Sequence, residues 1–384
     1  MRFAHLGDCH LGGWRQPELM ALNLESFHYA IKKCIDEKVD FVLVAGDLFD
    51  SAYPPIEIIK EAFQAFRKLK EANIPVFLIA GSHDYSASGK TFLDVLVKAG
   101  FCENVFVSEE KDGKIMLQPT IFKNIAIYGY PGKKSGLEVQ DVERIKLQDA
   151  LGLFRILMLH TTMRDAIGSL PILAVDQSKL PKVDYTALAH LHIKYNREGR
   201  VYCGPTFPNN SEELEELKGG SFYIVNTSSP REPQKYEINL KEVLILNIEI
   251  TNALTATEKI LDKLRAQNLK DKIIILKIAG SLEIGKTSDI RFNEIDEFVK
   301  SENAYVLLKN VNKLKSLESE TNIEIDSDNI EEEIITKYQE DNQHEFNSLI
   351  LPLISSLQLD KKEDEKSAVF EERLHSEIGK VINI

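Results

Sequence analysis

The segment Val76-Phe77-Leu78-Ile79-Ala80-Gly81-Ser82-His83-Asp84-Tyr85 carries the strongest indication of the fold. Its first four residues form a dense apolar run, which is typical of a buried strand in a parallel sheet. A polar, glycine-led segment follows, at the carboxyl end of the strand, where such sheets place their chemistry. His83 is therefore the first candidate functional residue.

The same arrangement of an apolar strand followed by His or Asp occurs at four other places. The segments concerned are Asp8-Cys9-His10 after strand 3–6, Asp47 and Asp50 after strand 41–44, His160 after 157–159, and Leu188-Ala189-His190-Leu191-His192. Because His190 and His192 are two residues apart, an extended strand would direct both imidazoles to one face. We expect all these side chains to gather along one edge of the fold.

The chain of 384 residues is long enough for two or three domains. Residues 1–110 alternate strands with amphipathic helices, such as a helix over 56–71, and this order favours parallel pairing. Further strands are predicted within 114–130 and 155–226, including 125–129, 155–160, 185–189, 201–203 and 221–225. Residues 1–235 are thus predicted to form two stacked sheets between helices.

A second unit is predicted over residues 236–314, with the order β-α-β-α-β. Its strands are expected at 243–250, 272–278 and 305–309, and its helices at 256–267 and 289–301. This unit contains no His, so no chemistry is assigned to it. An acidic linker over 315–328 then leads to helices within 329–384.

The apolar stripes of the last segment can hardly bury themselves alone. They form either a small helical subdomain or, as we prefer, a docking surface for the helices of a partner protein. The expected contact residues are Ile334, Tyr338, Leu351, Phe370, Leu374 and Ile378.

The formal net charge of −13 is unevenly distributed. Residues 315–384 contain 7 Lys and Arg and 18 Asp and Glu, a net of −11, so residues 1–314 carry only −2. Seven cations could form a phosphate-binding rim or could be scattered, solvated residues: Lys133, Lys134, Lys179, Lys182, Lys194, Arg197 and Arg200. Four scattered cysteines indicate reduced thiols, and the apolar runs are too short to span a membrane. We expect an intracellular, cytoplasmic protein.

The clustered His and Asp residues have the composition of a two-metal site. Two divalent metals about 3.5–4 Å apart can clamp the attacking and leaving oxygens of a phosphate ester. Such a site needs a bridging carboxylate, imidazoles and a small oxygen donor, which suit manganese, iron or zinc. We interpret His5, His28, His344 and His375 as ordinary core or surface residues.

The ordered motifs D-x-H, GD-x-x-D, GSHD, LH and H-x-H resemble the calcineurin-like metallophosphoesterases. The segments around Asp47, 128–132 and 202–206, together with the domain order, resemble the double-strand-break repair nucleases of the meiotic-recombination-eleven or SbcD type. The resemblance implies an α/β fold: a two-sheet metallophosphoesterase sandwich flanked by helices, a smaller α/β capping domain and a C-terminal helical partner-binding segment.

The same resemblance implies a role for each candidate residue. Asp8, His10 and His192 would bind one metal, His160 and His190 the other, and Asp47 would bridge the two. His83 would act as a general acid or stabilise the departing oxygen.

This sequence departs from the family pattern at three positions. Ser82 replaces an Asn that ligates the second metal, so we expect weaker binding there, unless Ser82 ligates directly or Asp84 compensates. Asp50 stands where some members carry His, and Ala189 where Gly is usual. Both of these look tolerable.

These observations predict a DNA exonuclease and endonuclease subunit with two Mn²⁺ ions, with iron, zinc or magnesium as alternatives. It would act on DNA ends as a homodimer, together with a coiled-coil ATPase of the Rad-fifty or SbcC type. The capping domain would position DNA, although no contact residues are assigned. One alternative is a phosphoesterase for small molecules or proteins. A second is a weakly cutting or non-cutting scaffold between DNA and the ATPase.

Overall fold

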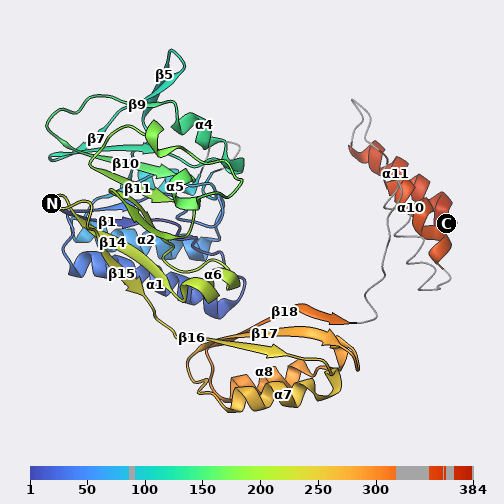
Figure 1. The fold of residues 1–384 in the computed structure, drawn as a ribbon. Helices are drawn as coiled ribbons and strands as arrows, with labels where there is room; N and C mark the ends of the chain where they lie inside the picture. The colour runs from blue at the N-terminus through green and yellow to red at the C-terminus, as the bar shows by residue number, and fades with distance from the viewer. Residues whose placement is uncertain (86–90, 317–345, 358, 360–366, 383–384) are drawn as a thin grey trace. The chain divides into compact units, whose positions relative to one another are not determined.

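The computed structural model describes residues 1–85, 91–316, 346–357, 359 and 367–382. The chain divides into two compact units, 1–315 and 316–384. The first unit contains every candidate metal ligand and is coloured blue to orange in Figure 1.

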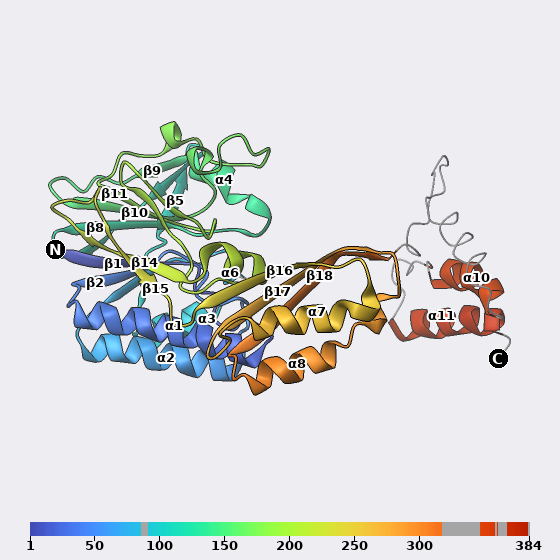
Figure 2. The same ribbon diagram turned by 60° about the horizontal axis from the view of Figure 1, so that its bottom comes forward.

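Six strands form the first sheet, in the order β15-β14-β1-β2-β3-β4. They are β1 (Arg2–Leu6), β2 (Phe41–Val44), β3 (Val76–Leu78), β4 (Glu103–Asn104), β14 (Gly220–Asn226) and β15 (Gln234–Ile238). Strands β1 to β4 pair in parallel, whereas β14 and β15 are antiparallel to their neighbours. The outer face is covered by helices α1 (Pro17–Asp36), α2 (Ile56–Glu71) and α3 (Phe92–Lys98), and Figure 2 shows α1 and α2 side by side along it. The predicted parallel arrangement of this region is confirmed.

The second sheet also has six strands, in the order β12-β13-β11-β10-β8-β7. They are β7 (Thr120–Phe122), β8 (Ile125–Tyr130), β10 (Phe154–His160), β11 (Tyr185–Ala189), β12 (Lys194–Arg197) and β13 (Arg200–Cys203). The outer face packs on α4 (Glu138–Val142) and on a small sheet of β5 (Ser108–Lys111), β6 (Lys114–Leu117) and β9 (Ile145–Leu147). Of this small sheet, β6 lies within the predicted strand region 114–130, whereas β5 and β9 are absent from the elements that the sequence predicts.

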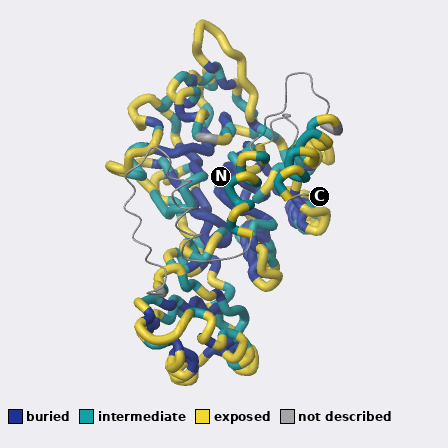
Figure 3. Tube along the Cα trace, turned by 90° about the vertical axis from the view of Figure 1, so that its right-hand side faces the viewer, coloured by how far each residue is buried: buried dark blue, intermediate teal, exposed yellow. Residues whose placement is uncertain are grey.

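The main core lies between the two sheets, because the strands are apolar on both faces. In β1, Phe3 faces the second sheet, whereas Ala4 and Leu6 face the helices. Figure 3 shows the buried strands at the centre of the unit and exposed residues at its rim. The predicted sandwich of two sheets flanked by helices is therefore confirmed.

A three-stranded sheet forms the rest of the first unit, which we call the capping part (residues 243–315). It contains β16 (Val243–Glu249), α7 (Ala253–Arg265), β17 (Ile273–Leu282), α8 (Phe292–Ser301) and β18 (Val306–Ser316), so the predicted element order is confirmed. β18 extends two residues into the predicted linker. One face of the sheet packs on α7 and α8.

The other face of the capping sheet contacts the part of the first unit that contains the two six-stranded sheets. Ile273, Ile275 and Leu308 share a core with Trp14, Leu19, Leu22, Phe207 and Leu214. Leu214 belongs to α6 (Ser211–Leu217), a helix capped by the side chain of Asn210. The Lys277 ammonium donates to both carboxylate oxygens of Glu215 on α6, at 2.8 and 2.7 Å. The remaining short helices are α5 (Arg164–Ile167), η1 (Lys134–Gly136), η2 (Gln177–Lys179) and η3 (Thr287–Asp289).

In the second unit, α10 (Asn347–Leu357) packs against α11 (Ser367–Ile382). Leu351 lies on α10, and Phe370, Leu374 and Ile378 lie on α11, each partly buried. Ile334, Tyr338, His344 and most of the predicted linker lie outside the described residues. Among the described helices, none is long and apolar enough to cross a membrane.

Candidate metal centre

Four strand ends meet at one edge of the sandwich and bring the candidate ligands together. Asp8 and His10 follow β1, Asp47 follows β2, His160 ends β10, and His190 and His192 follow β11. Backbone hydrogen bonds join the loops: the Asp8 N–H donates to the Gly46 carbonyl at 3.1 Å, and the His10 N–H donates to the Asp47 carbonyl at 3.0 Å. Two groups of side chains have ligand atoms within 4.8 Å of one another and no residue in common, Asp8-His10-His192 and Asp47-His160-His190; a third group, His10-Asp50-His83, shares His10 with the first.

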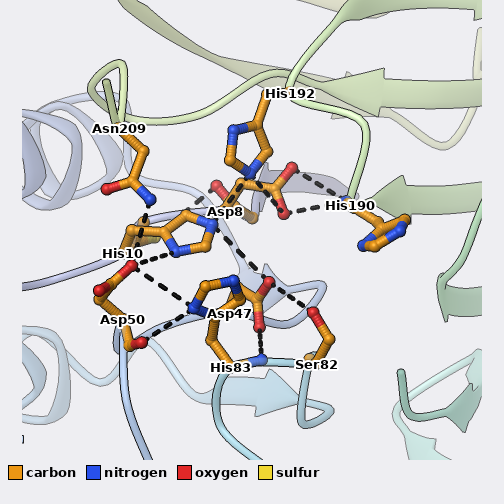
Figure 4. A network of polar contacts seen from close by, with 12 residues as sticks. Asp8, His10, Asp47, Asp50, Ser82, His83, His190, His192 and Asn209 are labelled. Atoms are coloured by element: carbon orange, nitrogen blue, oxygen red, sulfur yellow. Dashed lines mark hydrogen bonds and ion pairs between the residues drawn. The ribbon is translucent and has the colours of Figure 1, made fainter. Parts of the chain in front are cut away.

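In the first group, two imidazole nitrogens face each other. His10 Nε2 lies 2.9 Å from His192 Nε2, and His192 Nε2 lies 4.0 Å from Asp8 Oδ1 (Figure 4). The Asp8 carboxylate also accepts hydrogen bonds from the His190 N–H, at 2.9 and 3.0 Å. A cation that accepts both nitrogen lone pairs would fit this arrangement of one carboxylate and two imidazoles.

In the second group, His160 is fully buried and its Nε2 lies 3.1 Å from Asp47 Oδ2. Among the described residues, this Nε2 has no hydrogen-bond partner. A buried nitrogen without a partner is costly, and a metal ion would satisfy it.

Asp47 lies between the two groups. Its Oδ2 is 3.1 Å from His160 Nε2 and 3.7 Å from His10 Nε2, so one oxygen approaches a ligand from each group. Burial alone would raise the pKa of Asp47, but His160, His10 and His83 outweigh it and hold the pKa below its usual range. Asp47 is therefore an ionised carboxylate in the position that a bridging ligand requires.

Three imidazoles are oriented by a hydrogen bond at Nδ1. His10 donates from Nδ1 to Asp50 Oδ1 at 3.0 Å, and His192 donates from Nδ1 to Glu213 Oε1 at 3.0 Å. His160 donates from Nδ1 to the Ala45 carbonyl at 3.1 Å. An acceptor at Nδ1 fixes the proton there and directs the Nε2 lone pair into the site. The donor set thus fits two divalent cations.

The histidine pKa values follow the local charges. Burial opposes protonation of His160 and His192, but the carboxylates near each ring outweigh it and raise both pKa values to about 9. Burial and the neighbouring His160 together lower the pKa of His190 to about 4.

Most of these residues adopt a backbone conformation that is uncommon outside glycine. Asp8, His10, Asp47, His190 and His192 have positive φ, between 42° and 108°. Such conformations persist where the surroundings hold them, and they cluster at functional sites. The predicted extended strand through His190 and His192 is therefore wrong: β11 ends at Ala189, and the two imidazoles enter different groups.

The loop after β3 places Ser82 and His83 beside Asp47. The Ser82 hydroxyl donates to Asp47 Oδ2 at 3.4 Å, and the His83 N–H donates to Asp47 Oδ1 at 2.7 Å. The close approach requires glycine at position 81, since a Cβ there would lie 2.2 Å from Asp47 Oδ1. The His83 side chain is 43% exposed, and its Nδ1–H donates to the Asp50 carbonyl at 2.9 Å.

The Asp84 carboxylate is directed at backbone N–H groups and not at the candidate metal ligands. It accepts backbone hydrogen bonds from Leu48, Phe49 and Gly81 at 3.2, 3.0 and 3.0 Å. Burial and the nearby Asp47 raise its pKa to about 6, against these hydrogen bonds. Asp84 thus pins the loop after β3 to the loop after β2, which argues against the idea that it compensates for Ser82 as a ligand.

The sequence did not single out the residues that orient the ligands. The sequence places Asp50 at a strand end but predicts no role for it, and it predicts nothing for Glu213 and Asn209. Asn209 donates to Asp50 Oδ1 at 3.1 Å. Because Asn209 and Glu213 reach the site from the start of α6, no local sequence pattern marks them.

The remaining histidines and cations behave largely as ordinary residues. His5 is buried with its Nδ1 2.9 Å from the Tyr185 hydroxyl, and His28 Nε2 lies 2.9 Å from Glu61. Two cations of the predicted rim are paired within the chain, Lys133 with Asp141 and Arg200 with Asp165.

The fold and the paired ligand groups define a metallophosphoesterase. The family model of the calcineurin-like phosphoesterases matches residues 1–194. Among curated relatives, the DNA double-strand break repair protein Mre11 of Methanocaldococcus jannaschii is 29% identical over 311 residues, which are 72% of this chain and 82% of the relative. The Mre11 protein of Methanococcus maripaludis is 30% identical over 263 residues, 64% of this chain and 69% of the relative.

A third relative is longer. The Mre11 protein of Methanosarcina mazei is 27% identical over 330 residues, which are 80% of this chain but 49% of the relative. The chain belongs to the calcineurin-like phosphoesterase family, in the branch of the Mre11 double-strand-break repair proteins.

Proposed function

We propose that this protein is the manganese-dependent DNA nuclease subunit of a double-strand-break repair complex, hydrolysing phosphodiesters at a two-metal site. The observation that carries the proposal is the position of Asp47 Oδ2, 3.1 Å from His160 Nε2 and 3.7 Å from His10 Nε2. One carboxylate oxygen shared by two imidazole groups is the arrangement that a pair of metals needs.

The first metal would be held by Asp8, His10 and His192, and the second by His160 and His190, with Asp47 shared. When bound, the metals would polarise the phosphate and make water a nucleophile at neutral pH. Nitrogen and oxygen donors together favour manganese, iron or zinc over magnesium. Ser82 would be at best a weak donor to the second metal, because its hydroxyl is already directed at Asp47.

His83 would donate a proton to the departing oxygen. Its Nδ1–H is held by the Asp50 carbonyl, which leaves Nε2 as the atom that carries the transferable proton. His83 also lines a cavity of about 350 Å³ together with Asp47, Ser82, His190 and His192. An imidazole suits this role because its charge changes near neutral pH.

The substrate and partners follow from the family and the architecture. The names of the Mre11 relatives refer to DNA double-strand breaks, and we propose DNA ends as the substrate of this chain. The capping part would position the DNA. In the second unit, α10 and α11 would dock a Rad-fifty type ATPase through Leu351, Phe370, Leu374 and Ile378, and the complex would contain two copies of this chain.

A substrate comparison tests the proposal. Metal-stripped protein is titrated with Mn²⁺ and assayed on end-labelled duplex DNA, a mononucleotide and a phosphopeptide. We expect manganese-dependent cleavage of the duplex only. Preference for the mononucleotide or the phosphopeptide would favour a different phosphoesterase, and DNA binding without cleavage of any substrate would favour the scaffold.

A further inference from the structure

We propose that Glu213 is a positioning residue for the first metal site, holding His192 in the tautomer and orientation that binding requires. The inference rests on the proposed function, since it assumes that Asp8, His10 and His192 bind a metal. It assigns a role to a residue 21 positions beyond His192, on a separate element.

The geometry at His192 requires such a support. β11 ends at Ala189, and His192 has a φ of 52°, so the ring is not oriented by the sheet. Its Nδ1 lies 3.0 Å from Glu213 Oε1, and its Nε2 lies 2.9 Å from His10 Nε2. A carboxylate at Nδ1 keeps the proton on that side and leaves the Nε2 lone pair for the metal.

Glu213 is itself held in place. The Asn209 N–H donates to its Oε2 at 2.9 Å, and the Asn210 amide donates to its Oε1 at 2.7 Å. The side chain is only 23% exposed, so the hydrogen bond to His192 is partly shielded from water. Glu213 therefore presents a fixed acceptor.

His10, the other imidazole of this group, is supported in the same way. Its Nδ1 contacts Asp50 Oδ1 at 3.0 Å, and Asn209 holds that oxygen at 3.1 Å. Both imidazoles thus have a carboxylate behind them, and Asn209 contacts both carboxylates. The same arrangement of Asn209, a carboxylate and an imidazole Nδ1 thus occurs twice in this group. A glutamate that served only to cap α6 would not need to match the arrangement at His10.

The test measures metal binding directly. The full-length chain is stripped of metal, and Mn²⁺ binding is followed by calorimetry, with the visible absorption of bound Co²⁺ as a spectroscopic signature. Because partners of metal ligands typically contribute 10- to 100-fold to affinity, we expect Glu213→Ala to weaken the first site by about 10- to 100-fold. Glu213→Gln should lose less affinity for the metal at the first site, since its amide oxygen can still accept a hydrogen bond from His192 Nδ1–H. Binding at the second site should stay unchanged.

Glu216→Gln is the matched control, because Glu216 lies on the same helix and lines the same cavity. This variant should bind both metals with affinities within about twofold of the wild type, as only a distant charge is removed. Thermal unfolding establishes that each variant is folded.

Two results would overturn the inference: folded Glu213→Ala with wild-type affinity and cobalt spectrum at the first site, or a loss of affinity in Glu216→Gln as large as that in Glu213→Ala. A failure of the proposed function looks different. In that case the wild type itself would bind fewer than two metals, or His10→Ala would leave binding unchanged.

Discussion

Replacing Ser82 with Asn tests whether this chain has a weakened second metal site. The Ser82 hydroxyl lies 3.4 Å from Asp47 Oδ2, whereas a good O–H···O hydrogen bond is about 2.7–2.8 Å long. The hydroxyl is thus a weak contact of the bridging carboxylate, and Asp47, His160 and His190 are left as the protein donors of the second site. An Asn side chain is one heavy atom longer and carries an amide oxygen that can ligate a metal.

We expect Ser82→Asn to lower the Mn²⁺ concentration for half-maximal cleavage by about tenfold or more, since even indirect partners of a metal contribute about 10- to 100-fold. A tenfold change corresponds to about 1.4 kcal/mol of binding free energy. The assay is a manganese titration of cleavage on one duplex substrate, with calorimetry of the metal-stripped protein.

Ser82→Ala is the matched control and should change the metal requirement by less than about twofold, because it removes only a long hydrogen bond. An unchanged or higher requirement in Ser82→Asn would refute the weakened-site reasoning. So would a large loss in Ser82→Ala, which would mean that the hydroxyl itself ligates the metal.

Four further outcomes are expected. Asp47→Asn should abolish manganese-dependent cleavage. Its circular dichroism spectrum should stay native, because the amide oxygen can still accept a hydrogen bond from the His83 N–H. Near-normal cleavage by this variant would exclude the bridging role. His83→Asn should slow the cleavage of DNA by about 10²–10⁴-fold. It should slow the cleavage of bis(p-nitrophenyl) phosphate far less, because a nitrophenolate leaves without a proton. Equal reductions in the two cleavage rates would argue against proton donation by His83. Burial lowers the pKa of His5 to about 3, so the unfolded chain binds its proton below pH 6.5 while the folded chain does not. Between pH 7.5 and pH 5, the free energy of unfolding of the wild type, measured with urea, should therefore fall by about 2 kcal/mol more than that of His5→Gln. Equal falls in the two proteins would contradict a buried neutral imidazole. Truncation after Leu317 should leave a phosphoesterase that no longer co-purifies with its ATPase, and retained binding would move the docking surface elsewhere.

The sequence predicted most of the fold because its strands are apolar on both faces and end in polar loops. The predicted ranges of β2, β11 and α2 coincide with the structure. Their boundaries are marked by composition: Gly46 follows β2, His190 follows β11, and Pro55 precedes α2. Strands β5 and β9 of the small sheet were not predicted. β5 (Ser108–Lys111) is exposed throughout and lacks an apolar pattern, and β9 (Ile145–Leu147) has only three residues.

The candidate metal ligands could be predicted from the sequence because they lie at the ends of predicted strands. All six predicted ligands lie at or just after strand ends that the parallel order brings to one edge: Asp8, His10, Asp47, His160, His190 and His192. The assignment of His190 and His192 to one face failed, because the chain leaves the extended conformation after Ala189. Glu213 and Asn209 approach from another element, and their contacts depend on where α6 packs rather than on any local pattern.

Helix α6 joins two parts of the molecule that have different tasks. Glu213 touches a candidate metal ligand, while Glu215, two residues later, accepts from Lys277 on the capping sheet at 2.7 Å, and Leu214 between them is buried in the shared core. A seven-residue helix therefore contacts both the capping sheet and a candidate metal ligand. Under the proposed function, the part that positions DNA and the first metal site thus share one helix as their common support.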